Sequence, residues 1–245
     1  MNKRKRQFED VLEYISSLFY PNRCKFCNEL TAVFTDVCDD CMNSLPWIDG
    51  EICECCGSLK TDCGCKGRHG HYYEGIVAPL YYEDSVKQCI RNYKFNDERL
   101  NYKCLALLMS DTCASRYADI KFDFVTYIPM RTKNRRKRGY NQSRLLAKRV
   151  AENLDLTFVD DLLVKLYETK TQRTCSQLER RGNLAGVFDV NEKYTVENKT
   201  VLIIDDVKTS GATLNECGKM LYLNGASHVY CLTAALVNSK IEKDK

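Results

Sequence analysis

The stretch VLIIDDVKTSGAT, from Val201 to Thr213, is the part of this chain that decides its fold. Four apolar residues lead directly into Asp205 and Asp206, and a small, hydroxyl-rich segment with one glycine follows. A continuous apolar run is typical of a strand in a parallel sheet that is covered on both faces. Apolar residues then recur at helical spacing. We therefore expect a strand, a tight turn and a helix, with two carboxylates where the strand ends.

The segment after the strand has the composition of an anion site, and it consists of Thr209, Ser210, Gly211, Ala212 and Thr213. Free backbone amides, small side chains and hydroxyl donors at a helix start suit a phosphate, and ligands of open α/β sheets bind beyond the carboxyl ends of the strands. Two carboxylates repel a bare phosphate but accept hydrogen bonds from vicinal hydroxyls. A ribose 5-phosphate carries both groups. An acidic helix cap, the simpler alternative, accounts for one aspartate but not for the pair.

Strands and helices alternate along the rest of the chain, which predicts an α/β domain with a parallel sheet flanked by helices. Apolar runs and alternation predict strands over residues 75–83, 122–130, 161–167, 199–205 and 227–237. Helical spacing predicts helices over residues 84–95, 103–118, 141–154 and 212–225. The long polar segment 169–188 lacks a clear period, which indicates a functional loop.

The N-terminal region is rich in cysteine, and nine of the 15 cysteines lie between positions 24 and 65. Two CxxC pairs predict a structural Zn²⁺ site with four thiolates: Cys24, Cys27, Cys38 and Cys41. A second, less regular set is Cys53, Cys56, Cys63 and Cys65. It predicts a second zinc ion, with reduced cysteines as the alternative; Cys55 is left over as a spare or replaces a neighbouring ligand. One or two ions would supply folding free energy to a region too short and polar to form its own core.

Composition sets the remaining expectations for this chain of 245 residues. We expect an amphipathic helix over 1–22, which packs on the protein or lies on a membrane surface, a double zinc-ribbon-like domain over 23–70 and the α/β domain over 71–245. The net charge of +4 means that nucleic-acid affinity requires a local patch. No apolar run is long enough to span a membrane, and clustered cysteines indicate a cytoplasmic protein. Six scattered cysteines are expected in the core: Cys89, Cys104, Cys113, Cys175, Cys217 and Cys231.

A basic loop, RTKNRRKR, follows the strand predicted near residue 125. Its charged residues are Arg131, Lys133, Arg135, Arg136, Lys137 and Arg138. Such a loop suits pyrophosphate, a nucleic-acid backbone or plain solvation, and the first two roles are compatible. In the following GYNQS, the side chains of Tyr140, Asn141 and Gln142 suit contact with a base. Asn141 is alternatively the cap of the next helix.

These motifs together resemble a known family. VLIIDDVKTSGAT resembles the phosphoribosyl pyrophosphate motif of type I phosphoribosyltransferases, with Lys208 and Ser210 as variations. With YIPMRTKNRRKRGYNQS, TQRTCSQLERRGNLAGVF and the cysteine-rich region, the chain resembles the ComF competence family, which joins a zinc ribbon to a phosphoribosyltransferase domain. The resemblance runs from Cys24 to about Leu236. It implies that Asp205 and Asp206 hold the ribose hydroxyls, that residues 209–213 hold the 5-phosphate and that the basic loop meets the pyrophosphate.

Two functions remain open at this point. The first is phosphoribosyl transfer with Mg²⁺, in which the 169–188 loop closes as a lid; the acceptor and any catalytic base are unknown. Candidate lid residues, for which a helix-surface or salt-bridge role is the alternative, are Arg173, Gln177, Arg180, Arg181 and Asn183. The second is a module without transferase activity that handles single-stranded DNA or senses phosphoribosyl pyrophosphate. The resemblance implies competence DNA-uptake proteins as partners in both.

Overall fold

The computed structural model describes residues 21–65, 70–95, 101–130, 139–166 and 187–238, without the side chains of residues 94 and 95. Four predicted features lie outside these ranges: the N-terminal helix up to residue 20, the basic loop 131–138, the five candidate lid residues and Cys175.

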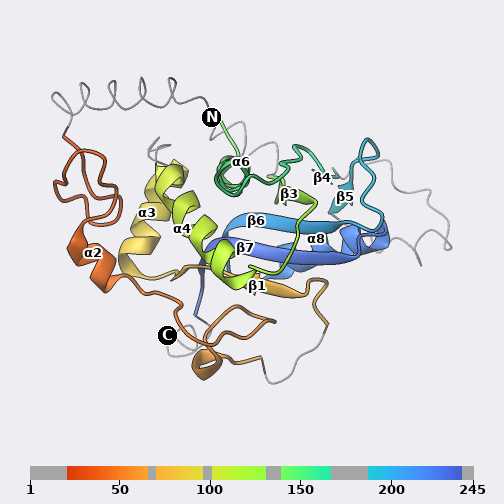
Figure 1. Cartoon of the computed structure of the whole chain (residues 1–245), viewed down its shortest axis with the longest axis horizontal. Helices are drawn as coiled ribbons and strands as arrows, with labels where there is room; N and C mark the ends of the chain where they lie inside the picture. Colours follow the sequence, from red (N-terminus) through yellow and green to blue (C-terminus); the bar gives the residue numbers. More distant parts are fainter. Residues whose placement is uncertain (1–20, 66–69, 96–100, 131–138, 167–186, 239–245) are drawn as a thin grey trace.

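A parallel sheet forms the centre of the fold, as predicted (Figure 1). Its strands follow the order β1 (Gly75–Val77), β7 (His228–Leu236), β6 (Thr200–Lys208) and β3 (Phe124–Tyr127), and β2 (Leu80–Tyr81) also pairs with β7. Every pairing in this sheet is parallel, and Asp205 of β6 lies opposite Thr233 of β7. The carboxyl ends of β3 and β6 therefore meet at one edge of the sheet.

The single strand predicted over residues 75–83 is wrong, because the chain forms two short strands there. Pro79 lies between them and has no N–H to donate to a neighbouring strand. Its carbonyl accepts a hydrogen bond from the Ile48 N–H at 2.9 Å, and Trp47 forms an antiparallel bridge with Leu80. The interruption thus joins the cysteine-rich region to the edge of the sheet.

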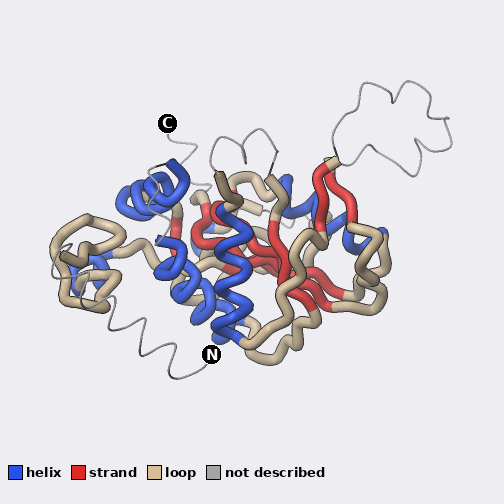
Figure 2. Tube along the Cα trace, turned by 90° about the horizontal axis from the view of Figure 1, so that it is seen from above, coloured by secondary structure: helices blue, strands red, loops and turns tan. Residues whose placement is uncertain are grey.

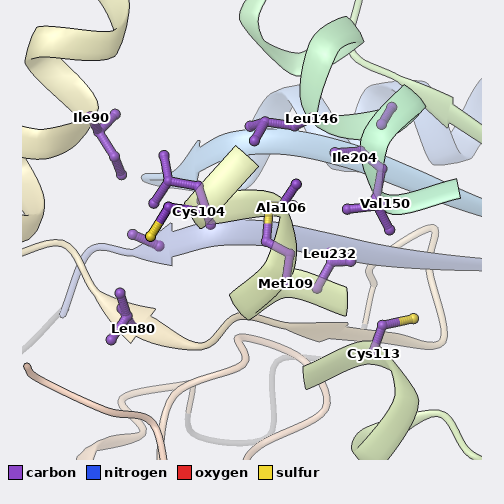
Figure 3. Packing of buried hydrophobic residues seen from close by; sticks show 14 of the residues in the cluster. Leu80, Ile90, Cys104, Ala106, Met109, Cys113, Leu146, Val150, Ile204 and Leu232 are labelled. Atoms are coloured by element: carbon purple, nitrogen blue, oxygen red, sulfur yellow. The ribbon is translucent and has the colours of Figure 1, made fainter. Parts of the chain in front are cut away.

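Helices cover both faces of the sheet, and Figure 2 shows its strands lying between them. The apolar cluster on one face includes residues of α3 (Asp84–Phe95), α4 (Asn101–Arg116) and α6 (Gln142–Leu154). The opposite face packs against α8 (Ala212–Leu223). In Figure 3, Met109 of α4, Val150 of α6 and Leu232 of β7 lie in the first of these layers. Among the scattered cysteines, the core positions of Cys89, Cys104, Cys113, Cys217 and Cys231 are confirmed.

A small antiparallel hairpin of β4 (Leu163–Lys165) and β5 (Phe188–Val190) lies beside the main sheet. Residues 166–187 connect its two strands. The buried Phe188 and Val190 join the same apolar cluster as α8. β5 was not predicted, because three residues at the end of a long polar segment have no detectable period. Among the described helices, none combines the length and the apolar character needed to cross a lipid bilayer.

Candidate ligand site and metal centres

The predicted carboxylate pair lies at the carboxyl edge of the main sheet. β6 runs through Asp205 and Asp206 to Lys208, so both aspartates lie within the strand, close to its end, and not in a loop. Neighbouring strand residues point to opposite faces of a sheet. Accordingly, the charge of Asp205 acts on the buried thiols of Cys217 and Cys231, whereas that of Asp206 acts on Tyr93. The two carboxylates thus act on different neighbours.

Asp205 is held in place from α6. The Ser143 hydroxyl, in the first turn of that helix, donates to Asp205 Oδ1 at 2.8 Å. The backbone N–H of Asp206 donates to the same oxygen at 2.9 Å. Two donors on one carboxylate oxygen fix the orientation of the Asp205 side chain. Ser143 was not singled out from the sequence, although it ends the quoted GYNQS motif.

The turn after β6 is exposed and leads directly into α8. Thr209, Ser210 and Thr213 are exposed, whereas Gly211 is buried and has φ of +78°. Gly211 occupies the N-cap position of α8 and has no side chain with which to cap the helix, while Ser210 Oγ accepts a hydrogen bond from the Ala212 N–H at 3.4 Å. Amide donors at a helix start suit an anion. The arrangement can therefore bind a phosphate next to two carboxylates.

The residues that flank the basic loop meet at β6. Ile128, just after β3, donates its N–H to the Ile204 carbonyl of β6 at 3.1 Å. The Asn141 side chain donates to the Ile128 carbonyl at 3.2 Å and also accepts from the Arg144 N–H as the cap of α6. The capping alternative for Asn141 is thus confirmed. Gln142 is fully buried, so its predicted contact with a base is wrong.

A second polar network at this edge was not predicted. The Tyr127 hydroxyl donates to Asp160 Oδ1 at 2.9 Å and to Asp161 Oδ1 at 3.2 Å. Arg144 Nε donates to both carboxylate oxygens of Asp160 at 2.9 Å, and Arg144 Nη2 forms an ion pair with it. The hydrogen bonds from Arg144, with that from Tyr127, hold the pKa of Asp160 below its usual value despite partial burial. The network joins β3, α6 and the segment before β4. No local sequence pattern indicates contacts among residues this far apart.

The first cysteine set fits a tetrahedral zinc ion. The four sulfur atoms of Cys24, Cys27, Cys38 and Cys41 lie within 4.8 Å of one another, with Cys27 and Cys38 at 3.6 Å. Zn–S bonds of 2.3 Å in a tetrahedron place sulfurs about 3.8 Å apart. Burial opposes ionisation of Cys24, but hydrogen bonds from the backbone of Cys27, Cys38 and Phe26 lower its pKa to about 6. One thiolate is thus favoured in the set, whereas burial and the neighbouring cysteines raise the pKa of Cys41. The short helix α2 (Asp39–Ser44) carries Cys41.

The second cysteine set fits a zinc ion equally well. The sulfurs of Cys53, Cys56, Cys63 and Cys65 also lie within 4.8 Å of one another, with Cys56 and Cys63 at 3.7 Å. The turn η1 (Lys60–Asp62) joins the two halves of the set. Burial opposes ionisation of Cys53, yet hydrogen bonds from Cys63 and from the backbone of Cys56 and Cys55 lower its pKa to about 7. The geometry of the irregular set is therefore confirmed, and Cys55 lies outside it as predicted.

Family models and related proteins match both parts of the chain. A double zinc ribbon domain matches residues 15–72, and a phosphoribosyl transferase domain matches residues 141–245. Competence protein F of Haemophilus influenzae is 27% identical over 86% of this chain and 95% of its own. DNA utilization protein YhgH of Salmonella typhi is 31% identical over 87% of this chain and 90% of its own. An adenine phosphoribosyltransferase structure covers 64% of this chain and 79% of its own, with 13% identity and a TM-score of 0.39.

Proposed function

The chain belongs to the ComF competence family, and on that premise we propose that its phosphoribosyl transferase domain binds phosphoribosyl pyrophosphate with Mg²⁺ in a protein that acts on DNA. One observation carries the proposal. Asp205 and Asp206 lie near the end of β6, two residues before an exposed, hydroxyl-bearing turn, and a glycine with φ of +78° then opens α8. Few ligands other than a ribose phosphate carry both hydroxyl groups for the two carboxylates and a phosphate for the turn.

Each part of the site has a role in this proposal. The amides and hydroxyls of residues 209–213 bind the 5-phosphate. Asp205, oriented by Ser143, and Asp206 accept hydrogen bonds from the ribose hydroxyls. The basic loop 131–138 binds the pyrophosphate, since its ends lie beside β6. Mg²⁺, when bound with the pyrophosphate, neutralises charge on that group. The candidate lid residues of 169–188 exclude water from the bound sugar.

Calorimetry with phosphoribosyl pyrophosphate and Mg²⁺ tests this proposal. Replacing Asp205 or Asp206 by Asn removes charge but little volume, and each lost charge-assisted hydrogen bond weakens binding by roughly 1.5–3 kcal/mol. The matched control is Asp123→Asn at the amino end of β3, where the carboxylate accepts a bond from the Thr200 N–H at 2.9 Å. That variant loses stability but keeps its affinity. Equal affinity in wild type and both site variants refutes the ribose role. Release of pyrophosphate then distinguishes a transferase from a sensor.

A second candidate function is binding of single-stranded DNA, and two observations favour it. The basic loop has six cationic residues in eight positions, which exceeds what one pyrophosphate contacts. A relative of this chain is named for DNA utilization. In this function the loop contacts DNA phosphates without reading their sequence. Sugar-phosphate binding and DNA binding then share one edge of the domain.

A loop variant separates the two ligands. Replacing Arg135, Arg136, Lys137 and Arg138 by Ala should weaken both, and the DNA effect should shrink at high salt because counterion release drives that binding. The control removes the same charge elsewhere on the surface, at the exposed residues Arg91, Lys103, Lys121 and Lys193. Titration of labelled single-stranded DNA with each protein across a salt series measures the slope of log affinity against log salt concentration. An unchanged DNA affinity and slope in the loop variant confines the loop to the small-molecule site.

A further inference from the structure

Three consecutive carbonyls in the turn over residues 53–56, which carries two cysteines of the second set, accept hydrogen bonds from the larger domain. The Glu54 carbonyl accepts from the Ile76 N–H of β1 at 3.2 Å, and the Cys55 carbonyl accepts from the Tyr73 hydroxyl at 2.9 Å. The Cys56 carbonyl accepts from Lys208 Nζ at 3.0 Å. Lys208 is the last residue of β6, so the third bond runs directly from a metal ligand to the phosphate-binding motif.

The same side chains lie beneath the phosphate-binding turn. A Cβ added to Gly211 would lie 3.1 Å from Lys208 Cε and 3.6 Å from the Tyr73 hydroxyl. Lys208 and Tyr73 are only 8% and 6% exposed, so both are held inside the protein. Gly57, which follows Cys56, also lies in close contact with the larger domain. A Cβ added to Gly57 would lie 2.8 Å from the Ile76 carbonyl oxygen. The turn at residues 53–57 thus packs tightly against the residues that lie beneath the turn at 209–211.

The first cysteine set is attached in a different way. The carbonyls of Cys24, Cys38 and Cys41 accept bonds from the N–H groups of residues 28, 42 and 45, within their own region. Their side chains contribute instead to the apolar cluster shared with α3 and α4. Figure 1 shows the two cysteine regions at different places, the first beside α3 and the second beside β1. The first set therefore serves as a matched control for the second.

From these contacts we infer that the second zinc site supports the phosphate-binding turn, with Lys208 as the positioning residue, so that its zinc occupancy sets the affinity for the sugar phosphate. The ordered turn around the metal fixes the Cys56 carbonyl, which fixes the Lys208 side chain under Gly211. Loss of the metal releases the carbonyl and leaves a buried ammonium group without its fixed acceptor. A small apolar residue at position 208 could not donate this hydrogen bond to the Cys56 carbonyl. It rests on the proposed sugar-phosphate site for its effect on affinity, but not for its effect on the turn.

Hydrogen exchange of the zinc-loaded, ligand-free full chain tests the effect on the turn. Cys63→Ser, Lys208→Met and Tyr73→Phe should each increase amide exchange in residues 207–214. Cys27→Ser in the first set should increase exchange within residues 22–45 and leave 207–214 unchanged. Tyr73→Phe and Lys208→Met remain informative if Cys63→Ser does not fold, because neither removes a metal ligand. Unchanged exchange at 207–214 in these two variants, or an equal increase in Cys27→Ser, overturns the inference.

Calorimetry with phosphoribosyl pyrophosphate and Mg²⁺ tests the effect on affinity. Cys63→Ser and Lys208→Met should each weaken binding about tenfold, as expected for one hydrogen bond to a charged group. The double variant should lose no more than the larger single effect, because both changes act through one contact. Additive losses mean that Lys208 acts independently of the metal turn and overturn the inference. If wild type binds no phosphoribosyl pyrophosphate, the proposed function fails, and the exchange experiment still decides the structural link.

Discussion

Gly211 allows the phosphate-binding turn to form. Its φ of +78° is a conformation that costs other residues about 1–2 kcal/mol, and an added Cβ would press on Lys208 Cε at 3.1 Å. Gly211→Ala should therefore destabilise the fold by about 1 kcal/mol and also weaken sugar-phosphate binding. Gly225→Ala is the matched control at the other end of α8, where φ is +93° and the nearest atoms belong to Glu197. Denaturant unfolding should show a similar loss in both variants. If the control weakens binding as much, the effect is not local to the turn.

Asp160 makes stability depend on pH. Its pKa lies below the usual value because Arg144 and Tyr127 donate hydrogen bonds to the ionised carboxylate. A depressed pKa in the folded state stabilises the protein above about pH 4, and this contribution is lost as pH falls through the folded-state pKa. Asp160→Asn should thus unfold with a shallower pH dependence below pH 4. At neutral pH the variant should lose about 1 kcal/mol or less, since these side chains are 39% and 36% exposed. Identical acid-unfolding curves for the two proteins contradict this assignment.

The residue types of the ligand site were predictable, but the contacts between distant residues were not. Asp205, Asp206 and the 209–213 segment form one local motif, so their neighbourhood follows from their order in the chain. Lys208 and Cys56 are 152 positions apart, and only the folded sheet brings them together. From the sequence, Lys208 was merely a variation of the motif. The hydrogen bond of Ser143 to Asp205 was hidden for the same reason, because α6 must pack on β6 before the two residues meet.

Among strands and helices, the strength of the burial pattern decided which were predictable. β6 and β7 are covered on both faces, so they read as apolar runs of strand length. β5 has three residues at the end of a polar segment, too few to show a period, whereas β4 lies within the apolar run 161–167 and was predicted. The break between β1 and β2 depends on hydrogen bonds that the cysteine-rich region makes around Pro79. Long-range contacts therefore set the features that local pattern missed.

The packing of α8 against the segment before β1 gives a test at this level. A Cβ on Gly218 would lie 1.8 Å from the Tyr72 carbonyl oxygen, although Ala favours a helix over Gly by about 1 kcal/mol. The backbone clash should prevail, so Gly218→Ala should destabilise the protein by about 1–3 kcal/mol. The control is Leu223→Ala at the exposed end of the same helix, with an expected change within about 0.5 kcal/mol. Denaturant unfolding measures both. A Gly218→Ala protein as stable as wild type means that residues 70–73 move aside at little cost.

For the chain as a whole, the two metal centres are joined to the α/β domain by different means, and both should contribute to one cooperative fold. The first set shares an apolar cluster with α3 and α4, while the second is bonded to β1 and β6.

We predict two zinc ions per chain by metal analysis of the purified protein. Removing both ions with a strong chelator should lower the thermal midpoint of the α/β domain itself, because the metal-free cysteine turns no longer hold their contacts. Reloading with zinc should restore the thermal midpoint. Cys27→Ser should bind one ion, and its midpoint should lie between those of the zinc-loaded and the zinc-free protein. Circular dichroism of the sheet and helices follows the transition. If the α/β domain of the zinc-free protein unfolds at the wild-type temperature, the two metal centres do not stabilise that domain. If the wild type binds one zinc ion per chain, one of the two predicted metal centres is wrong.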